Sequence, residues 1–294
     1  MTGAAVAIAQ ASHLRADCAT DGLLPMLADV ARPRIAAEDV AIIVAHPDDE
    51  TIGCGAQLPR LQGITVVVLT EGAPRNRPDA HAAGCSSVNA YARLRADELS
   101  DAMTLAGVPG RRIIRLGLTD QTLGLRLAEL ARTIDVLLSA RGIATVLTHA
   151  YEGGHPDHDA TAFAVHAAAL LRRRRGRSTR VIEMPFYHAG RGRWAVQRFS
   201  AHPACSGVAI RLNASERELK RKMLAVYASQ SSTLSLFDVD CERFRPAPGC
   251  DFRTLPNGGD ILYERYDWGM TSARWLALVR DAFTDLGLVQ HRWL

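Results

Sequence analysis

The sequence contains no long apolar run and no recognisable export signal. A membrane-spanning helix needs about 18 consecutive apolar residues, and no stretch of this chain approaches that length. The apolar stretch at residues 4–9 is short and has no positively charged segment before it, unlike a secretory signal peptide. From these absences we expect a cytoplasmic protein with no membrane span.

Cysteine is also scarce. The chain has six cysteines, with no CxxC pair and no zinc-finger spacing. We therefore expect reduced, mostly buried thiols in a reducing compartment. A serine nucleophile has little support either, since the chain lacks a Gly-x-Ser-x-Gly motif.

The chain carries little excess charge of either sign. Its 35 basic and 31 acidic residues leave a net charge of +4 over 294 residues, which is too weak to indicate a nucleic-acid partner. The densest basic run, residues 172–175, falls at the end of a predicted helix, where cations complement the helix dipole. Steering of an anionic substrate is the alternative interpretation of this run.

Strand-like and helix-like segments alternate along the chain. Apolar and β-branched runs predict strands at residues 40–45, 64–70, 112–116, 143–147 and 180–184. Helical patterns are found at residues 51–58, 89–105, 124–140, 160–171, 215–227 and 273–283. This alternation predicts an α/β fold: a mostly parallel sheet between two layers of helices, as in Rossmann-like proteins.

We expect one domain. Its core should span about residues 38–235, after an N-terminal extension at 1–38 and before a loop-rich part at 235–294. Residues 71–88 are predicted to form a long loop, and residues 228–260 to loop across the site.

The strand at residues 40–45 ends in a dense polar cluster. Residues 46–50, His-Pro-Asp-Asp-Glu, bring one histidine and three carboxylates together. These charges resist burial unless a cation or hydrogen-bond donors offset them. The following helix should direct its N-terminus at the cluster, since carboxylates and hydroxyls satisfy free N–H groups there. We therefore expect this cluster to be one half of a functional site.

A second polar cluster follows the strand at residues 143–147. Residues 153–159, Gly-Gly-His-Pro-Asp-His-Asp, open an alanine-rich helix, whose first turn suits Pro156 and the acidic residues. Ligands of parallel sheets bind at the carboxyl ends of the strands, and both clusters come at such ends. We therefore expect the clusters to meet at one edge of the sheet. His149 either lines that pocket or is a hydrogen-bonded histidine beside it.

His46, Asp49 and His158 offer two imidazole nitrogens and one carboxylate oxygen. Three protein ligands of this kind, with a fourth position open to water, are typical of a catalytic zinc site. Zinc lowers the pKa of bound water from about 15.7 to about 7, which makes hydroxide available at neutral pH. We therefore predict that these three residues bind Zn²⁺.

Three neighbouring side chains are predicted to be catalytic. Asp48 stays free beside the metal and can take the proton of the bound water as general base. His155, as imidazolium, can stabilise a developing oxyanion or protonate a leaving amine, and Asp157 can hold its ring in the required tautomer. Together these groups predict a metal-assisted hydrolase of amide or ester bonds.

The stretches Ala45–Glu50 and His155–His158 resemble the two motifs of the zinc-dependent N-deacetylases of the PIG-L/LmbE family. The spacing within both motifs matches, and residues 222–230 are similar to a later segment of the family. The resemblance implies an LmbE-like fold. It also implies that His46, Asp49 and His158 bind zinc and that Asp48 is the general base. His155 falls on the first histidine of the second motif.

Family members mostly remove acetyl groups from N-acetylglucosamine units in lipids, thiol glycosides or antibiotics, and some cleave other amides. The resemblance therefore implies a hydrolase of linear amides, a metal-dependent N-deacetylase. Its partner would be a small N-acetylated molecule. The sequence does not specify the oligomeric state.

Six further residues are candidates for contact with the substrate because they lie in the predicted long loop or near strand ends. They are Arg75, Arg77, Asn89, Asp120, Tyr187 and His188. For Asp120, helix capping is an equal alternative. Trp194, Trp268 and Trp275 are expected in the core rather than as sugar platforms.

The function predicted from the sequence is removal of an N-acetyl group from an amino sugar or glycoconjugate. One alternative is an amidase that acts on a thiol conjugate or an antibiotic-like amide. Another is a sugar- or nucleotide-binding module without chemistry. A phosphoesterase with two metal ions would need further ligands, for which only Glu50, Asp157 and Asp159 remain.

Overall fold

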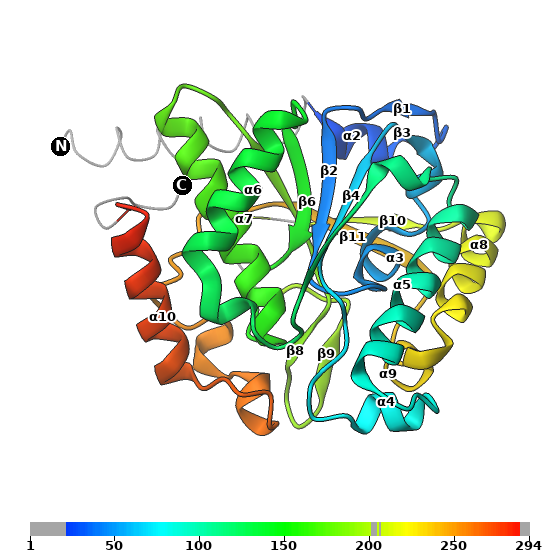
Figure 1. The fold of residues 1–294 in the computed structure, drawn as a ribbon. Helices are drawn as coiled ribbons and strands as arrows, with labels where there is room; N and C mark the ends of the chain where they lie inside the picture. The colour runs from blue at the N-terminus through cyan, green and yellow to red at the C-terminus, as the bar shows by residue number, and fades with distance from the viewer. Residues whose placement is uncertain (1–21, 201–204, 206, 289–294) are drawn as a thin grey trace.

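The computed structural model describes residues 22–200, 205 and 207–288. Its centre is a seven-stranded sheet with the strand order β10-β11-β7-β6-β2-β4-β5 (Figure 1). The strands are β2 (Val40–Val44), β4 (Thr65–Thr70), β5 (Ile113–Leu118), β6 (Thr145–His149), β7 (Arg180–Met184), β10 (Val208–Arg211) and β11 (Cys241–Pro246). The neighbours from β7 to β5 all pair in parallel, as expected from the alternation of strands and helices.

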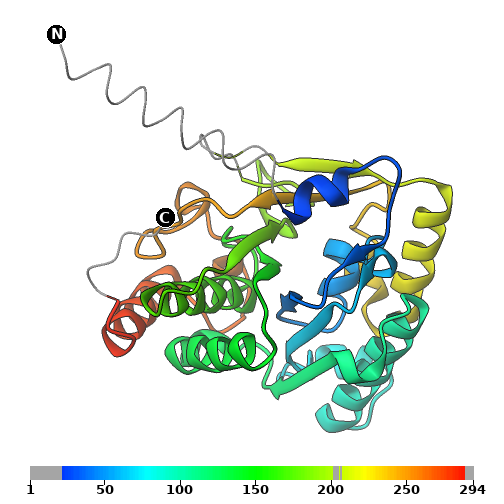
Figure 2. The same cartoon turned by 90° about the horizontal axis from the view of Figure 1, so that it is seen from above.

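Helices cover both faces of this sheet (Figure 2). They are α2 (Leu23–Ala28), α3 (Asp49–Cys54), α4 (Pro78–Ala82), α5 (Val88–Leu105), α6 (Leu127–Ala140), α7 (Pro156–Arg174), α8 (Ala214–Val226), α9 (Ser231–Leu234) and α10 (Ser272–Asp285). The predicted three-layer α/β fold is therefore confirmed. Within the described residues, no helix is both long enough and apolar enough to cross a membrane.

The pleat of the central strand divides the core into two halves. Ala41 and Ile43 of β2 pack with α6, α7 and α10, whereas Val40 and Ile42 pack with α2, α3, α5 and α8. Every residue of β2 is buried because both faces of the strand are covered, which explains its continuous apolar sequence.

The sheet has an antiparallel edge that the sequence pattern does not predict. β11 pairs antiparallel with β7 and with β10, inside the region expected to be loops. The charged residues Glu242 and Arg245 of β11 are buried, since each forms an ion pair, with Lys220 and Glu183 respectively. Charged residues in a sequence usually indicate exposed positions, so the sequence pattern does not predict β11 as a buried strand.

Two short pairs of strands complete the fold. β1 (Ile35–Ala36) pairs in parallel with β3 (Leu61–Gln62), and β8 (Tyr187–Ala189) pairs antiparallel with β9 (Trp194–Val196). In Figure 1 the β8–β9 hairpin lies beyond the carboxyl ends of the parallel strands. This is the edge of the sheet where the two polar clusters of the sequence meet.

Candidate active site

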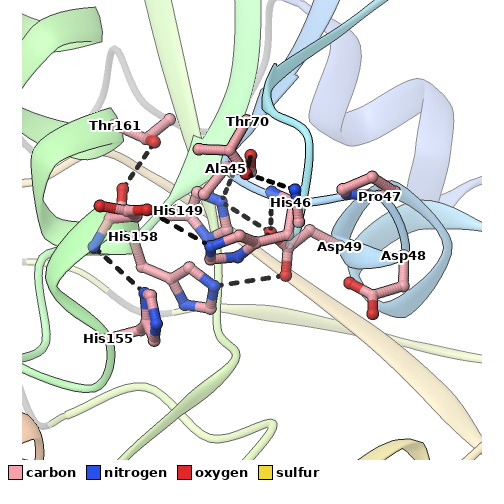
Figure 3. A network of polar contacts seen from close by, with 12 residues as sticks. Ala45, His46, Pro47, Asp48, Asp49, Thr70, His149, His155, His158 and Thr161 are labelled. Carbon is pink, nitrogen blue, oxygen red and sulfur yellow. Dashed lines mark hydrogen bonds and ion pairs between the residues drawn. The ribbon is translucent and has the colours of Figure 1, made fainter. Parts of the chain in front are cut away.

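Each polar cluster occupies a turn from a strand into a helix. His46 and Asp48 lie between β2 and α3, and His155 is the N-cap residue of α7, in the segment that follows β6. Since β2 and β6 are adjacent parallel strands, their carboxyl ends bring the two clusters together (Figure 3). The prediction that both clusters share one edge of the sheet agrees with this arrangement.

Of the three predicted metal ligands, the two histidines each contact the carboxylate of the third, Asp49. Its Oδ2 lies 3.3 Å from His46 Nδ1, and its Oδ1 lies 3.3 Å from His158 Nε2. The three side chains are buried, with exposed fractions of 9% for His46, 2% for Asp49 and 5% for His158. Burial alone would raise the pKa of Asp49, but His158 and His149 hold that pKa well below its ordinary value. Asp49 is therefore held as a carboxylate among imidazoles.

The outer nitrogen of His46 faces carboxylates. Its Nε2 lies 3.1 Å from Asp120 Oδ1 and 3.5 Å from Asp157 Oδ2. A histidine that binds a metal usually donates its second ring N–H to a carboxylate in this way, which fixes the ring and strengthens the ligand. Although burial opposes it, Asp120 raises the pKa of His46 well above its ordinary value. The donor set and its outer partners therefore fit a divalent metal ion such as zinc.

His149 is part of the cluster but is already engaged. Its ring stacks on His158 with centroids 4.1 Å apart, and its Nε2 accepts a hydrogen bond of 2.9 Å from the Ala45 N–H. Nε2 also lies 3.5 Å from Asp49 Oδ2. Because the Ala45 N–H occupies the lone pair of Nε2, His149 supports the ring of His158 rather than offering a further metal ligand.

Asp48 lies beside the convergent group rather than within it (Figure 3). Its φ of 117° is unusual for a residue other than glycine, and its side chain is buried. Arg95 Nη2 on α5 contacts both Asp48 Oδ2, at 3.2 Å, and the carbonyl oxygen of Pro47. Burial raises the pKa of Asp48 to about 7, although Arg95 opposes the rise. Asp48 is thus a carboxylate that can exchange a proton near neutral pH.

Arg95 is part of this site although its sequence context does not indicate it. Arg95 lies in the middle of a charged helix, where the pattern resembles a solvated surface, yet only 2% of it is exposed. Glu50 was considered only as a possible ligand for a second metal ion. It is fully buried and accepts hydrogen bonds from the Tyr227 hydroxyl and from the Asp48 N–H. Arg95 and Glu50 therefore hold the Pro47–Asp48 turn from two sides.

His155 is fixed by a backbone group. Its Nδ1 accepts a hydrogen bond of 3.2 Å from the N–H of Asp157, so its hydrogen lies on Nε2. The carboxylate of Asp157, which was predicted to hold this ring, instead accepts hydrogen bonds from the N–H groups of Gln121 and Leu123. Burial and the neighbouring His46 lower the pKa of His155 well below its ordinary value, so a neutral imidazole replaces the predicted imidazolium.

A cleft with a volume of about 140 Å³ opens above these residues. Of the six candidates for substrate contact, Asp120 and Tyr187 line it. The other lining residues are His46, Asp48, Asp49, Ile52, Gly72, Pro74, Asp79, Arg95, Gln121, His155, His158, Trp194, Gln230, Thr233, Phe237 and Trp268. Trp194 and Trp268, which were expected in the core, belong to this set, whereas Trp275 is fully buried.

The remaining four candidates for substrate contact lie outside the cleft. Arg75 is exposed and pairs with Glu71 at 2.8 Å, and Arg77 donates to the carbonyl oxygen of Ser86. Asn89 is exposed on α5. The ring of His188 is buried, and its two nitrogens face the carbonyl oxygens of residues 189 and 198. Their positions in or near the predicted loop, or at a strand end, did not predict the direction of their side chains.

The chain is similar to known proteins in sequence over part of its length and in fold. The family model described as PIG-L, GlcNAc-PI de-N-acetylase, matches residues 41–169, which include both motifs. No curated protein sequence matches the chain. Among solved structures, the A40926 pseudoaglycone deacetylase is similar at 19% identity with a TM-score of 0.53, over 71% of this chain and 96% of the other.

A second similar structure is N,N'-diacetylchitobiose deacetylase from Pyrococcus horikoshii, at 19% identity with a TM-score of 0.54. The similarity covers 84% of this chain and 94% of that one. At these identities the structures establish a shared fold. The predicted resemblance is therefore confirmed: residues 41–169 match the PIG-L family, and the chain has the fold of the LmbE-like deacetylases.

Proposed function

We propose that this protein is a zinc-dependent hydrolase that removes the N-acetyl group from an N-acetylated amino sugar or glycoconjugate. One observation carries the proposal. In a single cleft, His46 and His158 each contact the carboxylate of Asp49, and a separate buried carboxylate, Asp48, with a pKa of about 7, lies beside them. Hydrolysis of an amide at neutral pH needs both an activated water and a group that takes its proton.

His46, Asp49 and His158 are the residues that would hold the zinc ion. They supply nitrogen and carboxylate donors, which zinc prefers, and each histidine has a ring nitrogen 3.3 Å from an oxygen of Asp49. A zinc ion bound there would lower the pKa of a coordinated water and polarise the acetyl carbonyl group.

Asp48 would take the proton from the attacking water. It is then able to pass that proton to the nitrogen of the departing amine, since its pKa of about 7 allows both steps near neutral pH. Arg95 keeps the carboxylate in place through its contacts with Asp48 and Pro47. The products are acetate and a free amine, and the amine nitrogen carries the proton that Asp48 took from the water.

His155 would donate a hydrogen bond to the developing oxyanion. Since Nδ1 accepts from the Asp157 N–H, Nε2 carries the hydrogen on the part of the ring away from its own helix. A neutral donor of this kind stabilises negative charge that forms on the carbonyl oxygen in the transition state. His155 thereby complements Asp48, which handles the proton.

Acetate release from a panel of N-acetylated sugars, with free amine measured in parallel, tests the proposal. We expect Asp48→Asn to keep its zinc and lose more than about 100-fold in kcat, the usual size of a general-base contribution. His158→Ala should lose zinc itself, as measured by elemental analysis. Normal turnover by zinc-replete Asp48→Asn would overturn the assignment of the base. Release of a larger acyl group, with no acetate from any sugar, would favour the amidase alternative.

A further inference from the structure

Residues 227–230, Tyr-Ala-Ser-Gln, connect α8 to α9, and we call them the anchor segment. They belong to the stretch at 222–230 that resembles the PIG-L/LmbE family outside its two motifs. Three of the four side chains form hydrogen bonds with α3 or α5. These two helices carry Glu50 and Arg95, the residues that hold the Pro47–Asp48 turn.

The anchor segment contacts α5 on both sides of Arg95. Gln230 Nε2 donates a hydrogen bond to the hydroxyl of Tyr91, four residues before Arg95. Ser229 donates to both carboxylate oxygens of Glu98, three residues after Arg95, at 2.9 Å from its N–H and 2.6 Å from its hydroxyl. Residues three and four positions apart lie on one face of a helix. The anchor segment therefore fixes the part of α5 that carries Arg95.

Tyr227 reaches the other helix, α3. Its hydroxyl donates a hydrogen bond of 2.5 Å to Glu50 Oε1, which also accepts one of 2.7 Å from the Thr51 hydroxyl. The other carboxylate oxygen of Glu50, Oε2, accepts a hydrogen bond of 3.1 Å from the Asp48 N–H. Both Tyr227 and Glu50 are fully buried. A chain of hydrogen bonds therefore runs from the Tyr227 hydroxyl through Glu50 to the backbone of Asp48.

The backbone of Asp48 has a conformation that needs this support. Its φ of 117° is one that residues with a side chain rarely adopt, and such a conformation persists only where the surroundings hold it. The carbonyl oxygen of Asp48 accepts hydrogen bonds of 2.9 Å from the N–H groups of Thr51 and Ile52. The carboxylate of Glu50 holds the other side of the residue, its N–H. Because the backbone angles set the direction of Cβ, they also aim the Asp48 carboxylate.

Packing alone does not require this arrangement. A buried tyrosine hydroxyl needs one hydrogen-bond partner, and a backbone carbonyl oxygen would be enough. Tyr227 instead contacts a carboxylate two residues away from the proposed general base, and its neighbours Ser229 and Gln230 contact the helix of Arg95. One segment of four residues thus holds both groups that support Asp48.

We propose that Tyr227 is a positioning residue for the general base Asp48 and that the anchor segment keeps Glu50 and Arg95 in place around it. The proposal rests on the hydrolase function proposed above. Because Tyr227 is fully buried behind Glu50, it acts through Glu50 and does not touch the substrate. Its hydroxyl transfers no proton in the reaction. It fixes the direction in which the Asp48 carboxylate faces the attacking water.

A double-mutant cycle between Tyr227 and Asp48 tests this role. Tyr227→Phe removes only the hydroxyl, and we expect it to lower kcat about tenfold with KM and zinc content unchanged, because a small displacement of a catalytic group is costly in rate. In the Asp48→Asn background the same substitution should change kcat by less than about twofold, since the base through which it acts is missing. Equal losses in the two backgrounds, or an unchanged kcat in Tyr227→Phe, would overturn the proposal.

Tyr263→Phe is the matched control. Tyr263 is also fully buried but belongs to the other half of the core, so the loss of its hydroxyl should leave kcat unchanged. Glu50→Gln is a second test of the same chain. Glutamine has one acceptor oxygen in place of two and cannot accept from both Tyr227 and Asp48, so kcat should again fall about tenfold. A wild-type kcat in this variant would contradict the proposed chain.

Crystal structures of the wild type and of Tyr227→Phe separate this inference from the proposed reaction, since they do not depend on turnover. We expect the Asp48 carboxylate to lie about 1 Å from its wild-type position in the variant, with His46 and Asp49 in place. If the wild type releases no acetate from any sugar, the proposed function fails, and this displacement still supports the role of Tyr227. An Asp48 carboxylate that keeps its wild-type position in the variant overturns the proposal, whatever the kinetics.

Discussion

The buried ion pair between Lys220 and Glu242, next to α3, allows a quantitative test of the fold. Lys220 on α8 and Glu242 on β11 have fully buried side chains, and Lys220 Nζ lies 2.7 Å from Glu242 Oε1. Lys220 also donates to the carbonyl oxygen of Ile52, and Glu242 accepts from the Ala56 N–H. The pair therefore attaches α3, which begins at the predicted metal ligand Asp49, to α8 and to the edge of the sheet.

Removing one member should destabilise the protein strongly. At an effective dielectric constant of about 20, charges 2.7 Å apart attract each other by roughly 6 kcal/mol, and desolvation of both groups offsets much of that energy. Lys220→Met leaves the Glu242 carboxylate buried without its counter-ion and Ile52 without a donor. We expect the free energy of unfolding to fall by about 3–5 kcal/mol. The double variant with Glu242→Gln should recover part of the loss, since Gln keeps an acceptor for Ala56.

Urea denaturation followed by circular dichroism, with ΔG taken from the midpoint and slope, is the assay. Lys222→Met is the matched control, since Lys222 is exposed on the same helix, two residues away. It should change the free energy of unfolding by less than about 0.5 kcal/mol. A loss below about 1 kcal/mol for Lys220→Met, or a double variant less stable than the Lys220 single variant, would refute the reasoning.

Two further predictions concern the buried residues Arg95 and Glu152. Arg95→Met should lower kcat at least tenfold with zinc content unchanged, because the Pro47–Asp48 turn loses its hydrogen-bond donor. The control is Arg93→Met, at an exposed position on the same helix, which should leave kcat unchanged. Loss of zinc from the Arg95 variant would contradict the role assigned to Arg95. For Glu152, burial raises the carboxyl pKa from 4.5 to about 7. Between these values the unfolded chain has lost a proton that the folded chain keeps, so this group lowers stability as pH rises to about 7 and adds nothing further above it. The stability of Glu152→Gln relative to wild type should therefore rise by about 3 kcal/mol from pH 4.5 to pH 7 in thermal or urea unfolding, and a flat difference would contradict the assigned pKa.

The sequence by itself determined the layered architecture and the location of the site. The five parallel strands and the longer helices were all predictable, because apolar periodicity is a local property that each segment carries in its own residues. The position of both motifs at strand ends also followed from the sequence, since the carboxyl ends of parallel strands meet at one edge. His46, Asp49 and His158 were named on this basis, and their side chains do converge.

Only the tertiary structure decided which groups surround these residues. Arg95 resembled a surface residue until α5 placed it against Asp48. β11 resembled a loop until burial paired its charges with Lys220 and Glu183.

The hydrogen bond from Trp194 to Tyr266 joins residues distant in the sequence, and the tautomer of His155 depends on the direction of a single N–H group. Such contacts do not appear in the periodicity of the sequence, because each depends on where a distant segment lies and not on the pattern of neighbouring residues. The sequence therefore located the predicted ligands and base, whereas the folded chain determined how they are held and what lies beside them.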